Sequence, residues 1–371
     1  MVGIPLSSPD IAERDIRAVE DVLRSGRLAL GPKTAAFEKH LAEISGRKHG
    51  IAVNSGTAAL HLVVNALGMR SGDEVVVPSF TFPSTVNALL YERVTPIFAD
   101  IEPDTYNLSP SDLEKRITPR TKGVMVVDLF GHPAEWDRIL AIAKDKGLSV
   151  IEDSCEALGA KYKGKPIGSF GNAAAFAFYP NKQITTGEGG ALVTDDDRMA
   201  ALARSLRDQG RDRNGVEVEF GRLGYSYRMD EMSGALGLSQ IARLDEMNRK
   251  RARVAAMYTE RLMGLEWLEV PTVREDVSVS WFVYVVKLSE GIPRDRVMSA
   301  LTRKGVSVRA YFSPIHRMPY IRDYLAETGC PLPVTDSVAS RTMALPFHGG
   351  MTEGQIDSVA RALNDVKATL S

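Results

Sequence analysis

Seven short apolar runs recur through the first two-thirds of the chain, and stretches of helical period such as Thr57–Leu67 and Trp136–Lys146 separate several of them. This alternation is typical of an α/β fold, in which helices cover a largely parallel sheet whose strands are apolar on both faces. The carboxyl ends of such strands gather ligands, so polar residues that follow the runs are expected to share one crevice. The runs are HGIAVNS, DEVVVPS, TPIFADI, GVMVVDLFG, LSVIEDS, AAFAFY and GALVTD.

The pattern changes at about Asp230, where one long stretch of helical period begins and predicts a connecting helix. SWFVYVVKL and VSVRAYF then suggest two strands with a helix between them, and a last helix opens with the capping-box pattern Thr352-Glu-Gly-Gln355. A chain of 371 residues is long for one hydrophobic core. We therefore predict a large domain over residues 1–245 and a smaller C-terminal α+β domain over residues 246–371.

The charge balance excludes an electrostatic signature of nucleic-acid or membrane binding, because 46 basic and 47 acidic residues nearly cancel. The chain lacks both a signal-peptide pattern and a stretch of roughly 18 apolar residues, so a cytoplasmic location is expected. The cysteines, Cys155 and Cys330, lack the spacing of metal ligands. We expect no metal site, and we expect Cys155 to be a packed residue rather than a nucleophile.

NSGTAAL, from Asn54 to Leu60, passes from an apolar strand through Ser-Gly-Thr into helix-favouring residues. The free N–H groups at such a helix start form an anion site, Gly56 permits close backbone approach, and the Thr57 hydroxyl is a further donor. A phosphate fits this pattern. An ordinary N-cap by Ser55 or Thr57 explains it equally well.

VIEDS ends a buried-type strand with two carboxylates, Glu152 and Asp153. A carboxylate in that position needs a cation or hydrogen-bond donors, because an unpaired buried charge is costly. A protonated pyridine nitrogen would serve, and so would a structural salt bridge to a basic residue.

Lys182 lies between an aromatic run and a glycine-rich one in FAFYPNKQITTGEGG. A lysine amine held in a partly dry pocket can act as a nucleophile, whereas a lysine on a solvated loop needs no such setting. Phe82 follows its own strand and could lie against a planar cofactor, or it could be core material. Phosphate site, carboxylate, ring and lysine together match the needs of pyridoxal 5′-phosphate.

These motifs carry a family resemblance that extends from IPLSSPDI to the last helix. NSGTAAL, DEVVVPSFTF, EDSCEALGAKYKGKPIGSFGNAAAFAFYPNKQITTGEGG and GYSYRMDEMSGALGLSQIARLDE closely resemble the DegT/StrS-type sugar-nucleotide aminotransferases. The resemblance implies a fold type I pyridoxal-phosphate enzyme, with residues 1–245 as the cofactor-binding domain. It also implies a homodimer in which each active site is completed by the other subunit.

Matching positions imply roles for individual residues. Lys182 matches the Schiff-base lysine and Asp153 the partner of the pyridine nitrogen. Thr57 with Gly56 matches the phosphate cradle. Phe82 matches the ring that stacks on the cofactor, and Glu156 stands near the cofactor hydroxyl, where many members have glutamine or histidine.

Three positions depart from the family pattern. Ala177 stands where many members have a phosphate-binding serine, and Ser226 replaces an asparagine that often reaches the partner's phosphate. Both departures predict a weaker hold on the phosphate, because alanine cannot donate a hydrogen bond and serine reaches less far. Asp128 lies where histidine is frequent.

The resemblance also implies the reaction. L-Glutamate would give up its amino group and leave as 2-oxoglutarate, and the pyridoxamine phosphate so formed would aminate a nucleotide-linked keto sugar. ITTGEGG is most similar to members that aminate 4-keto-6-deoxyhexose nucleotides. Arg228, Tyr311 and His316 lie in regions that approach the sugar nucleotide in the family. A solvated arginine, a core tyrosine and a hydrogen-bonded histidine are the ordinary alternatives.

Other readings remain open from the sequence. The acceptor could be a 3-keto sugar or a keto-cyclitol. A related sugar dehydratase is disfavoured, because that type replaces the lysine with histidine. A catalytically silent regulatory or binding protein on the same fold would be expected to lose Lys182 or Asp153, and both are present.

Overall fold

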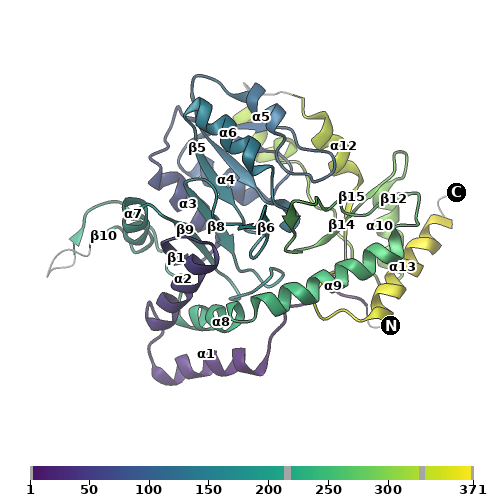
Figure 1. The fold of residues 1–371 in the computed structure, drawn as a ribbon, viewed down its shortest axis with the longest axis horizontal. Helices are drawn as coiled ribbons and strands as arrows, with labels where there is room; N and C mark the ends of the chain where they lie inside the picture. Colours follow the sequence, from purple (N-terminus) through teal and green to yellow (C-terminus); the bar gives the residue numbers. More distant parts are fainter. Residues whose placement is uncertain (1–2, 213–218, 326–330, 369–371) are drawn as a thin grey trace.

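A computed structural model describes residues 3–212, 219–325 and 331–368. Its largest element is a seven-stranded sheet with helices on both faces (Figure 1). β9 is antiparallel to both of its neighbours, and the other six strands run parallel to one another. The largely parallel α/β sheet predicted from the apolar runs is confirmed. In spatial order the strands are β1 (His49–Val53), β9 (Gly190–Thr194), β8 (Ala173–Ala177), β5 (Ser149–Asp153), β4 (Thr121–Val127), β2 (Glu74–Pro78) and β3 (Thr95–Ala99).

The strands are apolar throughout because both faces of the sheet are buried. Val75 and Val77 of β2 pack on one side against α3 and α4, whereas Val76 faces the opposite core, which contains Trp136 and Ile139 of α6. Such two-sided burial is typical of parallel sheets. The helices of this part are α1 (Glu13–Ser25), α2 (Pro32–Ile44), α3 (Gly56–Ala66), α4 (Pro83–Tyr91), α5 (Pro110–Arg116), α6 (Trp136–Lys146), α7 (Asp197–Arg207) and α8 (Glu231–Ile241).

The long helix predicted from Asp230 onward is wrong, because two helices occupy this stretch: α8 and α9 (Leu244–Leu262). The break falls at Arg243, whose backbone leaves the helical region and whose buried guanidinium pairs with Asp10 and Asp15 at 3.2 and 2.8 Å. α9 then runs away from the sheet toward the C-terminal part (Figure 1). Its first turns pack beneath the sheet and its last turns in a second core, so it connects the two. The domain boundary at residue 245 stays a prediction.

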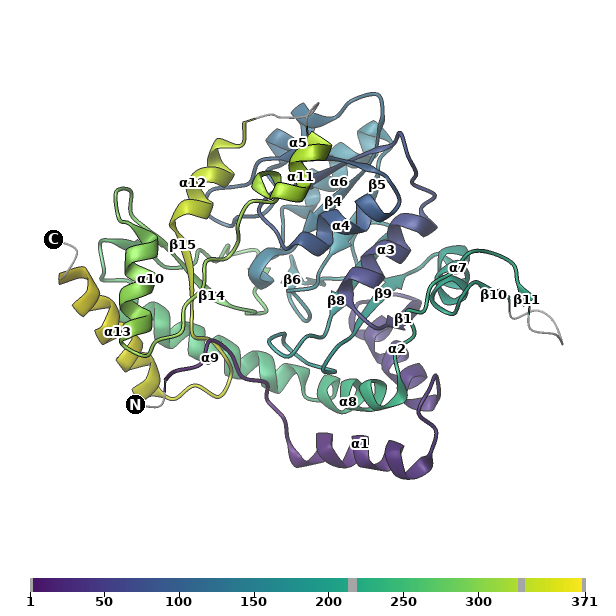
Figure 2. The same cartoon turned by 180° about the vertical axis from the view of Figure 1, so that it is seen from behind.

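The C-terminal part contains an antiparallel three-stranded sheet of β12 (Leu268–Glu269), β14 (Tyr284–Leu288) and β15 (Thr342–Leu345), in that order. The strand predicted in SWFVYVVKL is present, as β14, over the last five residues of this stretch. The strand predicted for VSVRAYF is wrong: this segment makes only isolated bridges, from Val306 to Ile4 and from Arg309 to Ala344 of β15, because its two ends pair with different segments and no continuous ladder forms. Its helices (Figure 2) are α10 (Arg294–Arg303), α11 (Pro319–Leu325), α12 (Pro333–Arg341) and α13 (Glu353–Ala368).

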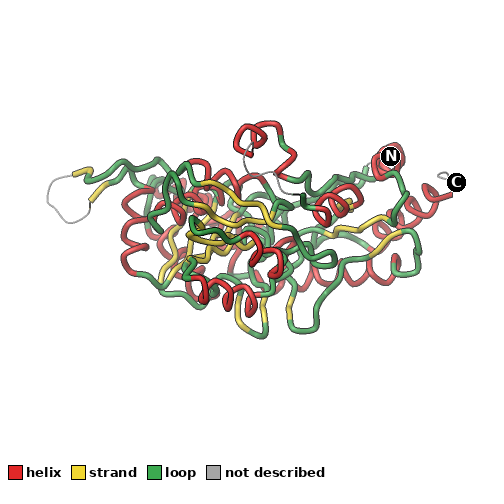
Figure 3. Tube along the Cα trace, turned by 90° about the horizontal axis from the view of Figure 1, so that it is seen from above, coloured by secondary structure: helices red, strands yellow, loops and turns green. Residues whose placement is uncertain are grey.

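The capping box of the last helix is confirmed. The Thr352 amide donates to Gln355 Oε1 at 3.0 Å, and the Gln355 amide donates to Thr352 Oγ1 at 3.3 Å. Two small sheets lie outside these larger ones. The first comprises β6 (Lys161–Tyr162), β7 (Lys165–Pro166) and β13 (Val277–Ser278). The second comprises β10 (Arg211–Asp212) and β11 (Glu219–Phe220), and it projects from one end of the molecule (Figure 3).

Candidate active site

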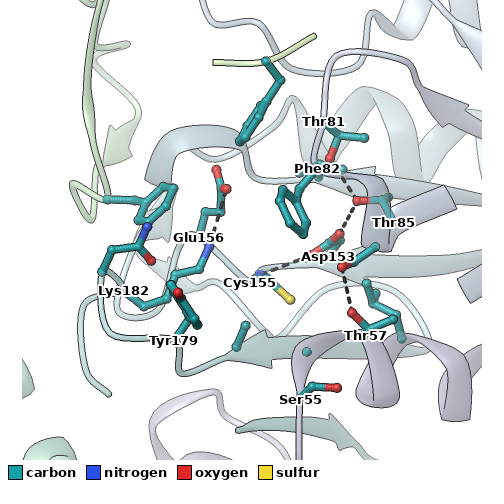
Figure 4. Close-up of a pocket in the computed structure, with 18 of the residues that line it drawn as sticks. Ser55, Thr57, Thr81, Phe82, Thr85, Asp153, Cys155, Glu156, Tyr179 and Lys182 are labelled. Atoms are coloured by element: carbon teal, nitrogen blue, oxygen red, sulfur yellow. Dashed lines mark hydrogen bonds and ion pairs between the residues drawn. The ribbon is translucent and has the colours of Figure 1, made fainter. Parts of the chain in front are cut away.

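A cavity of about 480 Å³ opens at the carboxyl ends of the parallel strands, as the sheet topology predicts. Figure 4 shows Lys182 and Glu156 on one side of it, Ser55 and Thr57 on the other, and Asp153 between them. Residues far apart in the chain meet here because each follows a strand of the same sheet or lies in the C-terminal part that faces it. The predicted site residues that line it are Gly56, Thr57, Phe82, Asp153, Glu156, Lys182 and Tyr311.

The start of α3 forms one wall of the cavity. Ser55 is the N-cap, since its hydroxyl accepts from the Ala58 amide at 3.1 Å, and the Thr57 hydroxyl lies 2.7 Å from that of Ser84. A Cβ on Gly56 would lie 2.7 Å from that of Ala177, so only glycine fits there. Ser55 therefore caps the helix, and Gly56 and Thr57 in its first turn line the cavity, where N–H groups left free at a helix start favour an anion.

Asp153 ends β5 and is 4% exposed. Its carboxylate accepts hydrogen bonds from the Thr85 hydroxyl at 2.7 Å and the Cys155 amide at 3.2 Å. No lysine, arginine or histidine among the described residues pairs with it, so the structural salt bridge considered from the sequence is not found there. A buried carboxylate that only accepts is suited to holding a ligand N–H cation.

Lys182 is largely buried, and its amine nitrogen lies 3.5 Å from Oε1 of Glu156 and 3.9 Å from the centre of the Phe282 ring. The other oxygen of Glu156 accepts from the Phe130 amide at 2.9 Å. Burial raises the pKa of Glu156, and the nearby lysine opposes this shift. The amine is thus held between one carboxylate and one aromatic face, away from bulk water.

Asp128 lies behind the cavity wall rather than in it. This fully buried side chain accepts from the Ala134 amide at 2.9 Å and from Trp136 Nε1 at 3.0 Å. The Ser154 hydroxyl lies 3.1 Å from Asp128 and 3.0 Å from the equally buried Glu152. Burial raises the pKa of Asp128 to about 7. Asp128, at the position where histidine is frequent in the family, therefore stabilises the structure behind the cavity and does not line it.

Cys155 lines the cavity and also packs against the core. Burial raises the pKa of its thiol well above the usual range, in agreement with the expectation that it is not a nucleophile.

Phe82 is 55% exposed at the cavity, so the alternative that it is a core residue is wrong. Its exposed face is available to a planar ligand.

Several cavity residues were not found from the sequence. Thr85 and Phe282 carry no local motif, and their roles depend on contacts with Asp153 and Lys182. Tyr179 stands in the aromatic run before the lysine, which is the one signal that could have identified it. Others that line the cavity without a signal of their own include Ser84, Val127, Arg309 and Phe312.

Three predicted substrate or cofactor residues lie outside this cavity in the single chain. Arg228 pairs with Asp208 at 2.9 Å, and its other terminal nitrogen lies 3.3 Å from the Ser226 hydroxyl. His316 contacts the Ser79 hydroxyl at 2.7 Å and Asp336 at 3.3 Å. The assignments of Ser226, Arg228 and His316 remain predictions.

The sequence profile of the DegT/DnrJ/EryC1/StrS aminotransferase family matches residues 9–364. The chain belongs to this family. Among the described residues of this aminotransferase, no three His, Cys, Asp or Glu side chains lie close enough together to hold a metal ion. Cys330 is not among the described residues. None of the helices described for this family member has both the length and the apolar character needed to cross a bilayer.

Relatives support the family assignment. GDP-perosamine synthase of Caulobacter vibrioides is 41% identical over 341 residues, which cover 91% of each chain. The spore coat polysaccharide biosynthesis protein SpsC of Bacillus subtilis is 38% identical over 98% of this chain and 97% of its own. Structures of the putative sugar aminotransferase Spr1654 of Streptococcus pneumoniae are known in apo, PLP and PMP forms. The apo form superposes on this chain with a TM-score of 0.95 at 26% identity, and the match covers 99% of this chain and 98% of that one. The fold type I architecture and the aminotransferase class are thereby confirmed.

Proposed function

We propose that this aminotransferase moves the amino group of L-glutamate to a nucleotide-linked keto sugar, most closely a 4-keto-6-deoxyhexose nucleotide. Pyridoxal phosphate is its cofactor, as predicted. The observation that carries the proposal is one cavity that holds a buried lysine amine, a buried carboxylate and an anion cradle. These groups are what amino transfer requires of the protein.

The residues present fit the cofactor. The N–H groups at the start of α3, with Thr57, would hold the phosphate, and the glycine at position 56 leaves room for it. Asp153 would hold the protonated ring nitrogen, and Phe82 would cover the ring. When bound, the cofactor withdraws electrons from the carbon whose amino group is exchanged.

Lys182 would attach the cofactor and then move a proton to and from that carbon through its amine nitrogen. Glu156 lies within reach of this nitrogen and holds the amine in the cavity. Tyr179, Phe282 and Phe312 line the same space and would limit access of water.

The sugar nucleotide as acceptor is supported by relatives. One is named GDP-perosamine synthase, and the Helicobacter pylori aminotransferase PseC, described as involved in pseudoaminic acid biosynthesis, superposes with a TM-score of 0.93 at 27% identity, over 99% of this chain and all of its own. We further propose a homodimer whose sites are shared, because Ser226 and Arg228 lie outside the cavity of their own chain. A 3-keto sugar or keto-cyclitol is the alternative acceptor.

The test is a panel of 4-keto, 3-keto and cyclitol acceptors with L-glutamate and pyridoxal phosphate, and formation of the amino product is measured by mass spectrometry. We expect turnover with a 4-keto-6-deoxyhexose nucleotide and none with Lys182→Ala. A protein that binds the cofactor but turns over no acceptor and leaves L-glutamate unchanged would instead be the silent regulatory protein.

A further inference from the structure

Arg251 is a buried arginine in the middle of α9, between the two cores that this helix joins. Met247, one turn before it, packs beneath the large sheet, and Val254, one turn after it, packs in the C-terminal core. Arg251 is 5% exposed, and no carboxylate in the part of the chain that the structure describes forms a salt bridge with it. A buried cation without a counter-charge is costly, so its hydrogen bonds have to compensate.

The guanidinium binds backbone carbonyls from two segments that are far apart in the chain. Its Nη2 donates to the Lys182 carbonyl at 2.8 Å and to the Asn181 carbonyl at 3.3 Å. Its Nη1 donates to the Phe282 carbonyl at 3.1 Å and to the Trp281 carbonyl at 3.4 Å. Because the guanidinium is a rigid plane, these bonds fix the two segments relative to each other.

These two segments carry side chains that meet in the cavity. The amine nitrogen of Lys182 lies 3.9 Å from the centre of the Phe282 ring, and both residues line the cavity. Gln183 strengthens the same junction, since its buried side-chain amide donates to the Ser280 carbonyl at 2.8 Å and to the Glu156 carbonyl at 2.6 Å. The guanidinium of α9 lies behind this wall, so it reaches the amine only through the backbone that it binds.

We propose that Arg251 is a positioning residue for the amine of Lys182: its guanidinium holds the ring of Phe282 over the amine, and the ring keeps water away. This inference rests on the proposed function, in which Lys182 attaches the cofactor. An apolar side chain at this position of α9 would fill similar space, but it would leave the four carbonyls without these donors. The arginine thus couples the order of two backbone segments to the reactivity of one amine.

Competitive acetylation of the cofactor-free protein tests this without turnover. Acetic anhydride labels the lysines, mass spectrometry of the peptides gives each rate, and the limiting rate at high pH measures access to the amine. The rate of Lys182 relative to exposed Lys165 should rise at least about tenfold in Arg251→Met, the change expected when a hydrogen bond from a charged donor is lost. Arg251→Lys keeps the charge but lacks the planar fork, so a smaller rise is expected. Arg249→Met, exposed on the same helix, is the matched control and should leave this rate unchanged.

A double-mutant cycle shows whether Arg251 acts through the ring. Phe282→Leu removes the ring and should raise the rate of Lys182 by itself, and Arg251→Lys should then add little. Additive effects would overturn the inference, and so would equal rates in the parent and the Arg251 variants. Circular dichroism and thermal unfolding verify the fold, since a purely structural role would lower the unfolding temperature and leave the labelling rate of the folded protein unchanged. If Arg251→Met does not fold, the cycle with Arg251→Lys decides.

Turnover separates this inference from the proposed function. In the loaded enzyme, Arg251→Met should lower kcat with L-glutamate at least about tenfold and Arg251→Lys by less, because the amine shifts while the substrate contacts stay. KM should change little, and a loss confined to KM would contradict the positioning role. A parent that transaminates no substrate, while the labelling rates change as expected, contradicts the proposed function alone.

Discussion

The amine of Lys182 lies between the carboxylate of Glu156, at 3.5 Å, and the face of Phe282, at 3.9 Å from the ring centre. The carboxylate and the ring approach the lysine from segments 26 residues before and 100 residues after it, a relationship that only the folded chain creates. The charged contact holds the nitrogen in place, and the apolar contact excludes water from it.

We expect Lys182→Ala to lower transamination by at least about a thousandfold, because the group that attaches the cofactor and moves the proton is gone. The variant should fold and still bind cofactor noncovalently. Steady-state turnover measures the loss, with exposed Lys165→Ala as the control. Activity within about tenfold of the parent, a barrier change of only about 1.4 kcal/mol, would contradict this role.

Asp153→Asn should fold but lose most activity, about a hundredfold or more, because a neutral amide does not balance a cationic ring nitrogen. Thr85→Val removes one donor to this carboxylate and should cost less, about tenfold. Turnover at saturating cofactor is the measurement. Near-normal activity of Asp153→Asn would show that another residue binds the ring nitrogen.

Ala177→Ser should tighten binding of pyridoxal phosphate. Ala177 lines the cavity beside Gly56, so a hydroxyl at this position adds a donor near the anion cradle. A hydrogen bond to a charged oxygen contributes about 1.5–3 kcal/mol, hence roughly a tenfold or larger fall in dissociation constant. Absorbance titration of both proteins at equal pH and ionic strength provides the comparison. An unchanged constant with the fold intact means that other groups already satisfy that phosphate oxygen.

Asp128 predicts a pH dependence of stability. Its pKa is raised from 3.8 to about 7, chiefly by burial, so between these values the folded protein binds more protons than the unfolded chain. Stability should therefore fall as pH rises from about 4 to about 7, by at most about 1.4 kcal/mol per pH unit for this group. Asp128→Asn should reduce this slope in thermal unfolding, whereas the exposed Asp145→Asn should not. Parallel curves for Asp128→Asn and the parent would contradict the raised pKa.

Mixing two inactive variants tests the shared site. If Arg228 serves the partner's cavity, hybrids of Lys182→Ala with Arg228→Ala contain one doubly altered site and one intact site. Random assortment then restores about a quarter of the parent activity in the mixture, and the purified hybrids should have about half. Co-expression with two affinity tags allows the hybrids to be purified and assayed. Hybrids as inactive as either variant alone would place Arg228 and Lys182 in the same chain's site.

The sequence by itself determined the strands of the large sheet and predicted residues that line the cavity at their carboxyl ends. Strands such as β2 can be predicted from the sequence because a strand buried on both faces is apolar throughout. The shared location of Gly56, Asp153 and Lys182 can be predicted because each follows or ends such a strand, and the carboxyl ends of parallel strands meet at one edge of the sheet. These are local patterns with a fixed spatial consequence.

The tertiary structure alone decided the features that depend on distant partners. The helix break at Arg243 arises from its buried pairing with Asp15, 228 residues earlier, a contact that no periodicity can reveal. Arg309 appears in a segment whose pattern suggested an ordinary strand, and its place in the cavity follows from bridging to Ala344. Thr85 likewise shows its role only where it meets Asp153. The sequence pattern indicates which side chains are buried. It does not indicate which polar groups contact each other, because those contacts depend on packing between segments far apart in the chain.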